Sequence, residues 1–277
     1  MGRHAVKTPP HHATWRQFLD TWVEADRIDT FESAWTWDHF YPLAPPYDGP
    51  NLEGWTMLAA LAQATTRLRL GAMVNGMHHR HPAVTANMAA TLDIVSGGRF
   101  ELGMGAGWNE MESAAYGIEL GTIRQRLDRF DEGIEIIRSL LDNTVTNFSG
   151  EYFTITDAWC EPKPLQERLP LVIGGKGKRR TLKTAARFAD QWDMTFPDGP
   201  SHWQELDEAL RGHCDAIGRD QSEITRSVHL GFGEDDDPDA LAEQADAFFG
   251  AGVDVVVWSM RGEITPHRLA PLAAALT

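Results

Sequence analysis

The sequence predicts one α/β domain folded as a (β/α)8 barrel. Eight short apolar segments alternate with segments of helical period along the 277 residues, and a barrel of this kind typically needs about 250 residues. Most strand-like segments lack a strict alternation of apolar and polar residues, which is expected of a parallel sheet that is buried on both faces. An open doubly wound sheet is the alternative, although such a sheet usually has fewer strands.

The predicted strands are short and rich in apolar residues. Each is bounded by polar residues, glycine or proline, which commonly end strands. In chain order the eight predicted strands are His4–Thr8, Ser33–Trp37, Arg69–Val74, Arg99–Gly103, Pro170–Ile173, Gln191–Thr195, Ser227–Gly231 and Val253–Trp258.

Apolar residues at helical spacing lie between several of these strands. Pro82 suits the first turn of one such helix, and Gly97-Gly98 suits its C-terminal end. The glycines at 250–252 end a later helix in the same way. The four apolar stripes are Val84, Met88, Leu92 and Val95; Ile123, Leu127, Phe130, Ile134, Ile137 and Leu141; Leu241, Ala245, Phe248 and Phe249; and Leu269, Leu272 and Leu276.

One connection, at about residues 143–169, is longer than the others. Thr146–Asp157 has the pattern of an irregular hairpin, and the proline-rich segment Glu161–Pro164 follows it as a stiff connector. Long connections in barrels commonly carry functional loops. We therefore expect an insertion between the fourth and fifth strands, placed at the barrel mouth as a wall of the pocket, within a single domain that spans residues 1–277.

Composition narrows the class of protein. The formal net charge of −15 disfavours a general role on nucleic acid or on an anionic membrane. Two distant cysteines, Cys160 and Cys214, form neither a disulfide framework nor a zinc pattern and fit a reducing compartment. The sequence lacks an apolar run of about 18 residues and an apolar signal core. We expect a cytoplasmic protein.

The candidate functional residues follow the predicted strands, whose C-terminal ends face one pocket in a barrel. Asp38 and His39 come directly after the second strand and form an ionisable pair. Such a pair at a strand end is a candidate for acid–base catalysis, because imidazole titrates close to neutral pH. The alternative is a plain role in capping a helix or fixing a loop by hydrogen bonds.

The segment after the fifth strand predicts an anion site. Gly174, Gly175 and Gly177 allow the backbone to approach a ligand, and the helix that starts near Thr181 offers free N–H groups. Four basic residues add positive charge, and the spacing excludes a Walker A loop. A solvated helix start that balances an acidic surface is an equally good interpretation. The four basic residues are Lys176, Lys178, Arg179 and Arg180.

Two further motifs have weaker signals. Gly103, Gly105 and Gly107 at the fourth strand end would let a flat ring lie against the backbone, but a tight turn explains them as well. Three nearby histidines could bind a metal, yet we expect none, because the first strand end offers no matching pair of ligands. These histidines are His78, His79 and His81.

Five motifs in order resemble the bacterial-luciferase-like flavin-dependent oxidoreductases, and within them the branch that uses the deazaflavin coenzyme F420. The resemblance covers about residues 8–192 and weakens after Phe196. The motifs are Ala34–Phe40, Arg80–Val84, Ala89–Phe100, Glu101–Glu110 and Leu171–Gly175.

This resemblance implies a (β/α)8 barrel with an insertion between the fourth and fifth strands, and a flavin-like ring across its mouth. It places Asp38 and His39 beside the ring, and implies a non-proline cis peptide at Val74-Asn75 or Asn75-Gly76. It implies that Gly105, Gly107 and Trp108 border the ring. Contacts to the cofactor phosphate are implied for Gly174, Gly175, Lys176, Gly177, Lys178 and Thr195.

The chain also departs from the family pattern. Trp108 stands where sugar-phosphate dehydrogenases of the family carry an acid, which argues against the same substrate. Glu110 is the nearest acid, and we expect it to line the substrate pocket together with Trp37.

The resemblance favours an F420-dependent oxidoreductase that transfers a hydride between the deazaflavin and a small organic substrate, in a family whose members are often homodimers. His39 would be the general acid or base, and Asp38 would orient it. An FMN-dependent monooxygenase supplied by a separate reductase is the alternative within the family. A metal-dependent hydrolase or a non-catalytic cofactor-binding protein is the alternative of another class.

Overall fold

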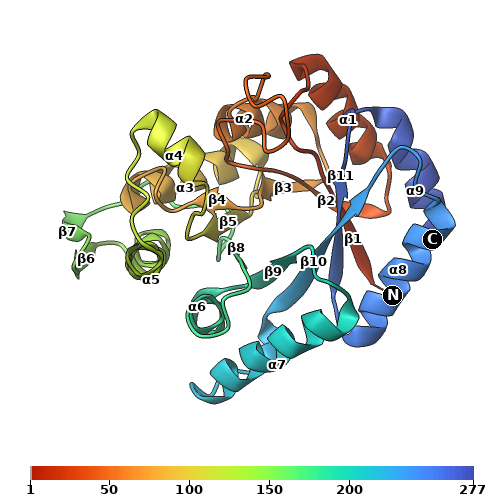
Figure 1. Cartoon of the computed structure of the whole chain (residues 1–277). Coiled ribbons are helices and arrows are strands. Elements are labelled where there is room, and N and C mark those ends of the chain that lie inside the picture. The colour runs from red at the N-terminus through yellow and green to blue at the C-terminus, as the bar shows by residue number, and fades with distance from the viewer. Residues whose placement is uncertain (1) are drawn as a thin grey trace.

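The computed structural model describes residues 2–277 and shows a parallel sheet rolled into a barrel (Figure 1). Neighbouring strands pair in the order β3-β2-β1-β11-β10-β9-β8-β5-β4, and every pair is parallel. The strands are β1 (Arg3–Lys7), β2 (Phe31–Thr36), β3 (Arg69–Ala72), β4 (Asn75–Gly76), β5 (Leu102–Gly105), β8 (Leu171–Gly174), β9 (Gln191–Thr195), β10 (Thr225–Phe232) and β11 (Val255–Met260).

The nine segments occupy eight barrel positions, because β3 and β4 are the two halves of one strand. They are separated at Met73–Val74, where the peptide bond is cis. β4 pairs with β5 near the C-terminal ends, and a parallel bridge joins Leu70 to Phe100 near the other end. These contacts bring the third strand against the fourth, so the predicted (β/α)8 barrel is confirmed. The strand boundaries differ from the prediction by three residues at most.

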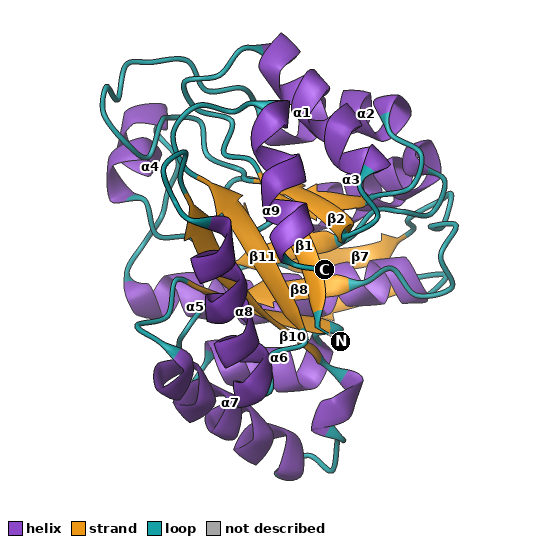
Figure 2. Ribbon diagram, turned by 90° about the vertical axis from the view of Figure 1, so that its right-hand side faces the viewer, coloured by secondary structure: helices purple, strands orange, loops and turns teal. Residues whose placement is uncertain are grey.

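Helices surround the strands, as the side view in Figure 2 shows. No helix within residues 2–277 combines the length and the apolar character needed to cross a bilayer. The helices are α1 (Trp15–Arg27), α2 (Gly54–Ala64), α3 (Pro82–Ser96), α4 (Glu110–Tyr116), α5 (Ile123–Asp142), α6 (Thr181–Phe188), α7 (Pro200–Asp215), α8 (Pro238–Ala251) and α9 (Leu269–Ala275), with 3-10 turns at η1 (Gln221–Glu223) and η2 (Pro266–Arg268).

The helix α3 confirms the predicted ends and most of the predicted apolar stripe, since Met88, Leu92 and Val95 pack on the core. Pro82 occupies its first turn, and Gly97 ends it in the left-handed conformation with φ 70°. Val84, however, is 52% exposed, and the buried face is built from small residues that include Ala86 and Ala89. Small side chains let α3 pack closely between α2 and α5, a requirement that hydrophobicity along the sequence does not reveal.

Residues 143–169 hold a two-stranded antiparallel hairpin of β6 (Thr146–Ser149) and β7 (Thr154–Ala158). Both ends of this segment join the amino-terminal end of the barrel, because it connects the end of α5 to the start of β8. The Glu132 carboxylate of α5 accepts hydrogen bonds from the backbone N–H groups of residues 151–153, and Phe153 packs edge-on against His81. The hairpin therefore runs along the outer helices, with its turn beside the N-cap residue of α3. Its role as a wall of the pocket stays a prediction.

Candidate functional site

Asp38 follows β2 at the C-terminal rim of the barrel and is almost fully buried. Its carboxylate accepts hydrogen bonds from Arg80 at 2.8 and 2.9 Å, from His79 Nδ1 at 3.0 Å and from the Gly76 N–H at 3.3 Å. Burial alone would raise the pKa of Asp38, but the hydrogen bonds and positive charge of His79 and Arg80 hold it below its ordinary value. Asp38 is thus a fixed anion that organises the loop after β4.

His39 points instead toward a carboxylate that the sequence interpretation missed. His39 Nδ1 lies 2.8 Å from Glu112 Oε2, and the other oxygen of Glu112 accepts the N–H groups of Phe40 and Tyr41. Burial raises the pKa of Glu112, yet the bonds from His39 and the Phe40 N–H bring it below its ordinary value. Glu112 therefore fixes both the orientation and the tautomer of the His39 ring.

Glu112 and Glu110 lie on opposite sides of the short helix α4. Glu112 and Ser113 are the residues that α4 buries, whereas Glu110 is exposed in its first turn. Two residues along a helix correspond to a rotation of about 200°, so only one of these acids can face His39. The local pattern of α4 gave no signal for this choice, because its large apolar residues, Met111 and Tyr116, are both exposed.

Two indole rings flank His39. The ring centroids of Trp37 and Trp108 lie 5.6 and 5.5 Å from that of His39, both edge-on. Asn51 connects this group, because its side chain accepts from Trp37 Nε1 at 3.2 Å and donates to the His39 carbonyl. Trp37 is buried, while Trp108 is 60% exposed at the rim. The two indole rings thus present apolar surface beside His39.

Val74 packs against the apolar residues inside the barrel, and glycines make room for it. A Cβ atom on Gly105 would lie 2.6 Å from Val74 Cγ2, and one on Gly174 would lie 2.8 Å from Val74 Cγ1. A Cβ atom on Gly107 would likewise lie 2.3 Å from Nδ1 of the His78 ring. The glycines at these strand ends therefore serve close side-chain packing in this structure. The cis peptide, Met73–Val74, falls one bond earlier than the resemblance implied.

The loop after β8 presents unpaired backbone donors at the same rim. No N–H group of residues 176–180 donates a hydrogen bond within the described chain, and α6 begins without a side-chain cap. Gly175 has φ 140°, which glycine alone adopts readily. A Cβ on Gly177 would lie 2.7 Å from Thr181 Oγ1. Such a helix start is a favourable position for an anion.

Only part of the positive charge in this loop is free. Lys178 is paired with Glu205, and Arg180 with Asp128 and Asp131. Lys176 donates to the Phe196 carbonyl at 3.0 Å and remains exposed, as does Arg179. At the neighbouring end of β9, Thr195 lies two residues after the buried Asp193, so both side chains point to the same face of the strand.

The three clustered histidines have separate roles. His79 donates to Asp38, and His78 Nε2 lies 3.2 Å from the Ser113 hydroxyl. His81 caps α3 by accepting the Ala83 N–H. Among residues 2–277 no group of three or more His, Cys, Asp and Glu side chains is arranged to hold a metal ion.

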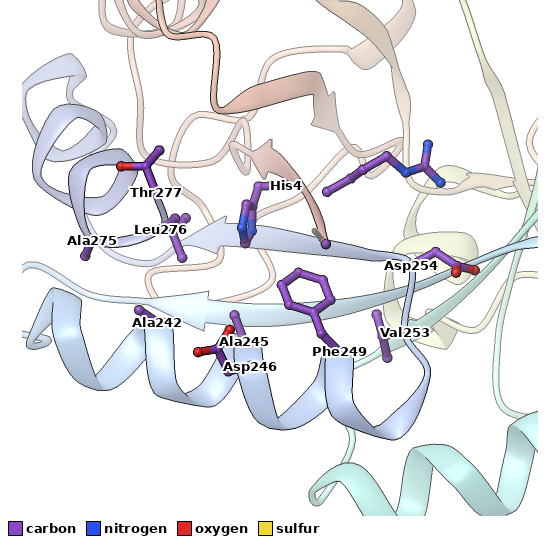
Figure 3. A pocket seen from close by; sticks show the side chains of 12 residues that line it. His4, Ala242, Ala245, Asp246, Phe249, Val253, Asp254, Ala275, Leu276 and Thr277 are labelled. Atoms are coloured by element: carbon purple, nitrogen blue, oxygen red, sulfur yellow. The ribbon is translucent and has the colours of Figure 1, made fainter.

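A separate hollow lies at the opposite end of the barrel (Figure 3). It is lined by residues at the start of β1, by α8 and by the C-terminal residues, and His4 packs edge-on against Phe249 within it. Burial lowers the pKa of His4 to about 4, so this imidazole is neutral at physiological pH. Barrel enzymes place their chemistry at the C-terminal strand ends, which favours the rim around His39.

The chain matches a known protein family over nearly its whole length. The model of the luciferase-like monooxygenase family matches residues 2–274. A phthiodiolone/phenolphthiodiolone dimycocerosates ketoreductase of Mycobacterium tuberculosis is 32% identical over 254 residues, which cover 83% of this chain and 66% of that protein. The chain thus spans slightly less than two thirds of the length of that relative.

Two solved structures share the fold. An F420-dependent secondary alcohol dehydrogenase in complex with an F420–acetone adduct superposes with a TM-score of 0.86 at 18% identity, over 98% of this chain and 99% of that chain. The oxygenating constituent of 3,6-diketocamphane monooxygenase from Pseudomonas putida, in complex with FMN, gives a TM-score of 0.75 at 18% identity, over 100% and 96% of the two chains.

Proposed function

Because the chain belongs to the luciferase-like monooxygenase family, we propose that it is an F420-dependent oxidoreductase acting on a small neutral carbonyl compound or the corresponding alcohol. The observation that carries the proposal is the placement of two features on one rim. A histidine held by a buried carboxylate and a loop of unpaired N–H groups both lie at the C-terminal ends of the strands.

The residues of the β8–α6 loop fit an anionic cofactor. The free N–H groups of residues 176–180 and the start of α6 favour a phosphate group. Gly175 and Gly177 leave space where any side chain would be strained or would meet Thr181. Lys176 and Arg179 are exposed beside them and supply positive charge. We assign these groups to the cofactor phosphate, with Gly174 and Lys178 next to them.

His39 is the group that we assign to proton transfer. Glu112 binds Nδ1, so Nε2 is the ring nitrogen left to exchange a proton with the oxygen of a substrate. The paired Glu112 carboxylate stabilises the protonated ring, in the manner of an acid that supports a catalytic histidine. Asp38 cannot share this task easily, because Arg80 and His79 already occupy its oxygens.

The surroundings of His39 favour a neutral substrate. Trp37 and Trp108 line the approach and offer apolar ring surface. When bound, F420 would supply or accept the hydride, while the protein orients the reactants and handles the proton. The names of the similar ketoreductase and alcohol dehydrogenase agree with interconversion of a ketone and an alcohol.

Titration of the purified protein with F420 and with FMN tests the cofactor. We expect quenching of tryptophan fluorescence at micromolar F420, since Trp37 and Trp108 border the rim. Binding of FMN without binding of F420 would contradict the F420 assignment. Stoichiometric zinc without affinity for either cofactor would refute the proposed function as a whole.

An FMN-dependent monooxygenase supplied by a separate reductase is the second candidate. One observation favours it: Lys178 and Arg180 are neutralised by carboxylates, so the remaining charge suits a single phosphate. Oxygen separates the candidates, because reduced flavin reacts with O2 and reduced deazaflavin reacts with it only slowly. Substrate-dependent O2 consumption with FMN would favour this second candidate.

A further inference from the structure

Lys7 is a buried cation inside the barrel. It ends β1, its exposed fraction is 7%, and the barrel interior around it includes an apolar cluster with Trp35, Val172 and Val257. Barrel interiors are usually filled by branched apolar residues, and an ammonium removed from water is costly unless it is paired. A lysine at this position therefore calls for a reason beyond packing.

The ammonium group of Lys7 binds Met73, a residue that several strands hold in place. Lys7 Nζ donates to the Met73 carbonyl oxygen at 2.7 Å. Met73 is also held at two other points: its N–H donates to the Thr36 carbonyl at 2.9 Å, and its sulfur lies 2.9 Å from His229 Nε2. Met73 is thus fixed by β1, β2 and β10 at once.

Asp193 compensates the charge of Lys7 from the other side of the barrel. Its carboxylate is fully buried, accepts the Ser227 hydroxyl at 2.8 Å and lies 3.5 Å from His229 Nε2. Burial lowers the pKa of Lys7 to about 8 and raises that of Asp193 to about 6, while each charge counteracts the shift of the other. Burial also keeps His229 neutral. At neutral pH the barrel therefore encloses one cation and one anion.

Val74 is the residue that this arrangement positions. It follows Met73 directly, is only half-buried at the rim, and its methyl groups fit against Gly103, Gly105 and Gly174 from two other strands. A shift of the Met73 carbonyl would move Val74 out of a space that leaves little clearance. Lys7 is therefore linked to Val74 through the Met73 carbonyl.

We propose that Lys7 is a positioning residue for the cofactor site. By holding the Met73 carbonyl, it fixes the position of Val74, and Val74 forms the surface that the cofactor ring contacts. The part of this inference that concerns the cofactor rests on the proposed function. The part that concerns Val74 rests on the protein alone and can be measured without a cofactor.

The test replaces Lys7 and follows Val74 and the cofactor separately. Lys7→Met removes the ammonium at similar volume, and Lys7→Gln keeps a donor for the Met73 carbonyl. Because Lys7→Met removes the positive charge that favours ionised Asp193, Lys7→Met with Asp193→Asn is the variant to use if the single one does not fold. His4→Gln is the matched control, since His4 is also buried on β1 and accepts a hydrogen bond, from Trp258 Nε1, at the far end of the barrel.

Two measurements distinguish a role of Lys7 in positioning Val74 from a general contribution to the stability of the protein. The first is the methyl NMR signals of Val74 in the cofactor-free protein, and the second is the Kd for F420 from fluorescence. We expect Lys7→Met to shift or broaden the Val74 signals and to weaken F420 binding about tenfold, as is typical when a group that supports a binding residue is lost. Lys7→Gln should restore most of both, and His4→Gln should change neither, whatever its melting temperature.

Unchanged Val74 signals and an unchanged Kd in Lys7→Met would overturn the inference. Equal effects of Lys7→Met and His4→Gln would overturn it as well, since they would indicate general destabilisation. A wild-type protein that binds neither F420 nor FMN would refute the proposed function and the cofactor role of Lys7 together. The Val74 signals would then still decide whether Lys7 positions that residue.

Discussion

Glu112 and His39, 73 positions apart in the chain, are joined by a 2.8 Å contact between Glu112 Oε2 and His39 Nδ1. The carboxylate is wholly buried in α4, whereas the ring retains some exposure at the rim. The buried member is held further by backbone N–H groups of residues 40 and 41. This arrangement fixes one nitrogen of the ring and leaves the other for chemistry.

Glu112→Gln should lower kcat about a hundredfold while leaving the Kd for F420 close to that of the wild type. The amide can still accept backbone N–H groups, but it carries no charge to stabilise a protonated His39. Asp207→Asn is the control, because Asp207 is also a buried helix carboxylate, on α7 and bonded to Gln221 and Arg211. Steady-state kinetics with both variants check this. Similar kcat values for the two variants would argue against a role of Glu112 in turnover.

His39→Ala should lose turnover by about 10²–10⁴-fold, the usual contribution of a general acid or base. Cofactor affinity should stay nearly intact, because the β8–α6 loop, to which we assign the cofactor phosphate, is elsewhere on the rim. His267→Ala, an exposed histidine in η2, serves as the comparison and should keep full activity. The measurement is kcat beside the F420 titration, and an unchanged rate would remove His39 from the mechanism.

Lys176→Ala should weaken F420 binding several-fold at low salt, with a smaller effect at high salt, because an exposed charge is screened by ions. Lys183→Ala offers a matched loss of charge on the exposed side of α6, away from the β8–α6 loop. Fluorescence titrations at two salt concentrations measure both. Equal losses in the two variants would mean that only net charge matters and that the loop is not a specific anion site.

Asp38→Asn should lower the free energy of unfolding by about 3–5 kcal/mol at neutral pH, because it leaves Arg80 and His79 without their buried anion. The folded pKa of Asp38 is lowered, so its ionised form stabilises the protein above the unfolded pKa, and this stability disappears as pH falls through the folded value. The gap between wild type and variant should therefore narrow in acid.

Urea unfolding at pH 7 and at acidic pH checks this prediction. Asp246→Asn is the control, since Asp246 is exposed on α8, and surface changes are usually worth less than about 0.5 kcal/mol. A gap that stays constant with pH would show that the charge of Asp38 is not what stabilises the loop.

Lys7 should make the wild type more stable as pH rises from about 8 to about 10.5. The folded pKa of Lys7 lies near 8, below the ordinary value of 10.5, so in this range the unfolded chain binds more protons than the folded one. The gain is at most about 3.5 kcal/mol, since one pKa unit corresponds to about 1.4 kcal/mol. Lys7→Met should lack this rise, and unfolding measured at several alkaline pH values compares the two. Parallel pH curves would contradict the charged, buried state of Lys7.

The sequence determined the parts of this protein that depend on local pattern. Short apolar segments and helical stripes predicted the barrel, because the period of burial repeats within a few residues. Asp38-His39 was placed correctly at the end of β2, and the glycine loop was placed correctly before α6. These features follow from residues that are neighbours along the chain, so a single sequence is sufficient to indicate them.

The tertiary structure alone decided which groups meet. It paired His39 with Glu112 and not with Glu110, and it neutralised Lys178 with Glu205. It also turned Lys7 inward onto Met73. Each of these contacts joins positions at least 27 apart in the chain. Their geometry depends on helix rotation and strand register, which no local pattern encodes, because they arise only when distant segments pack into one barrel.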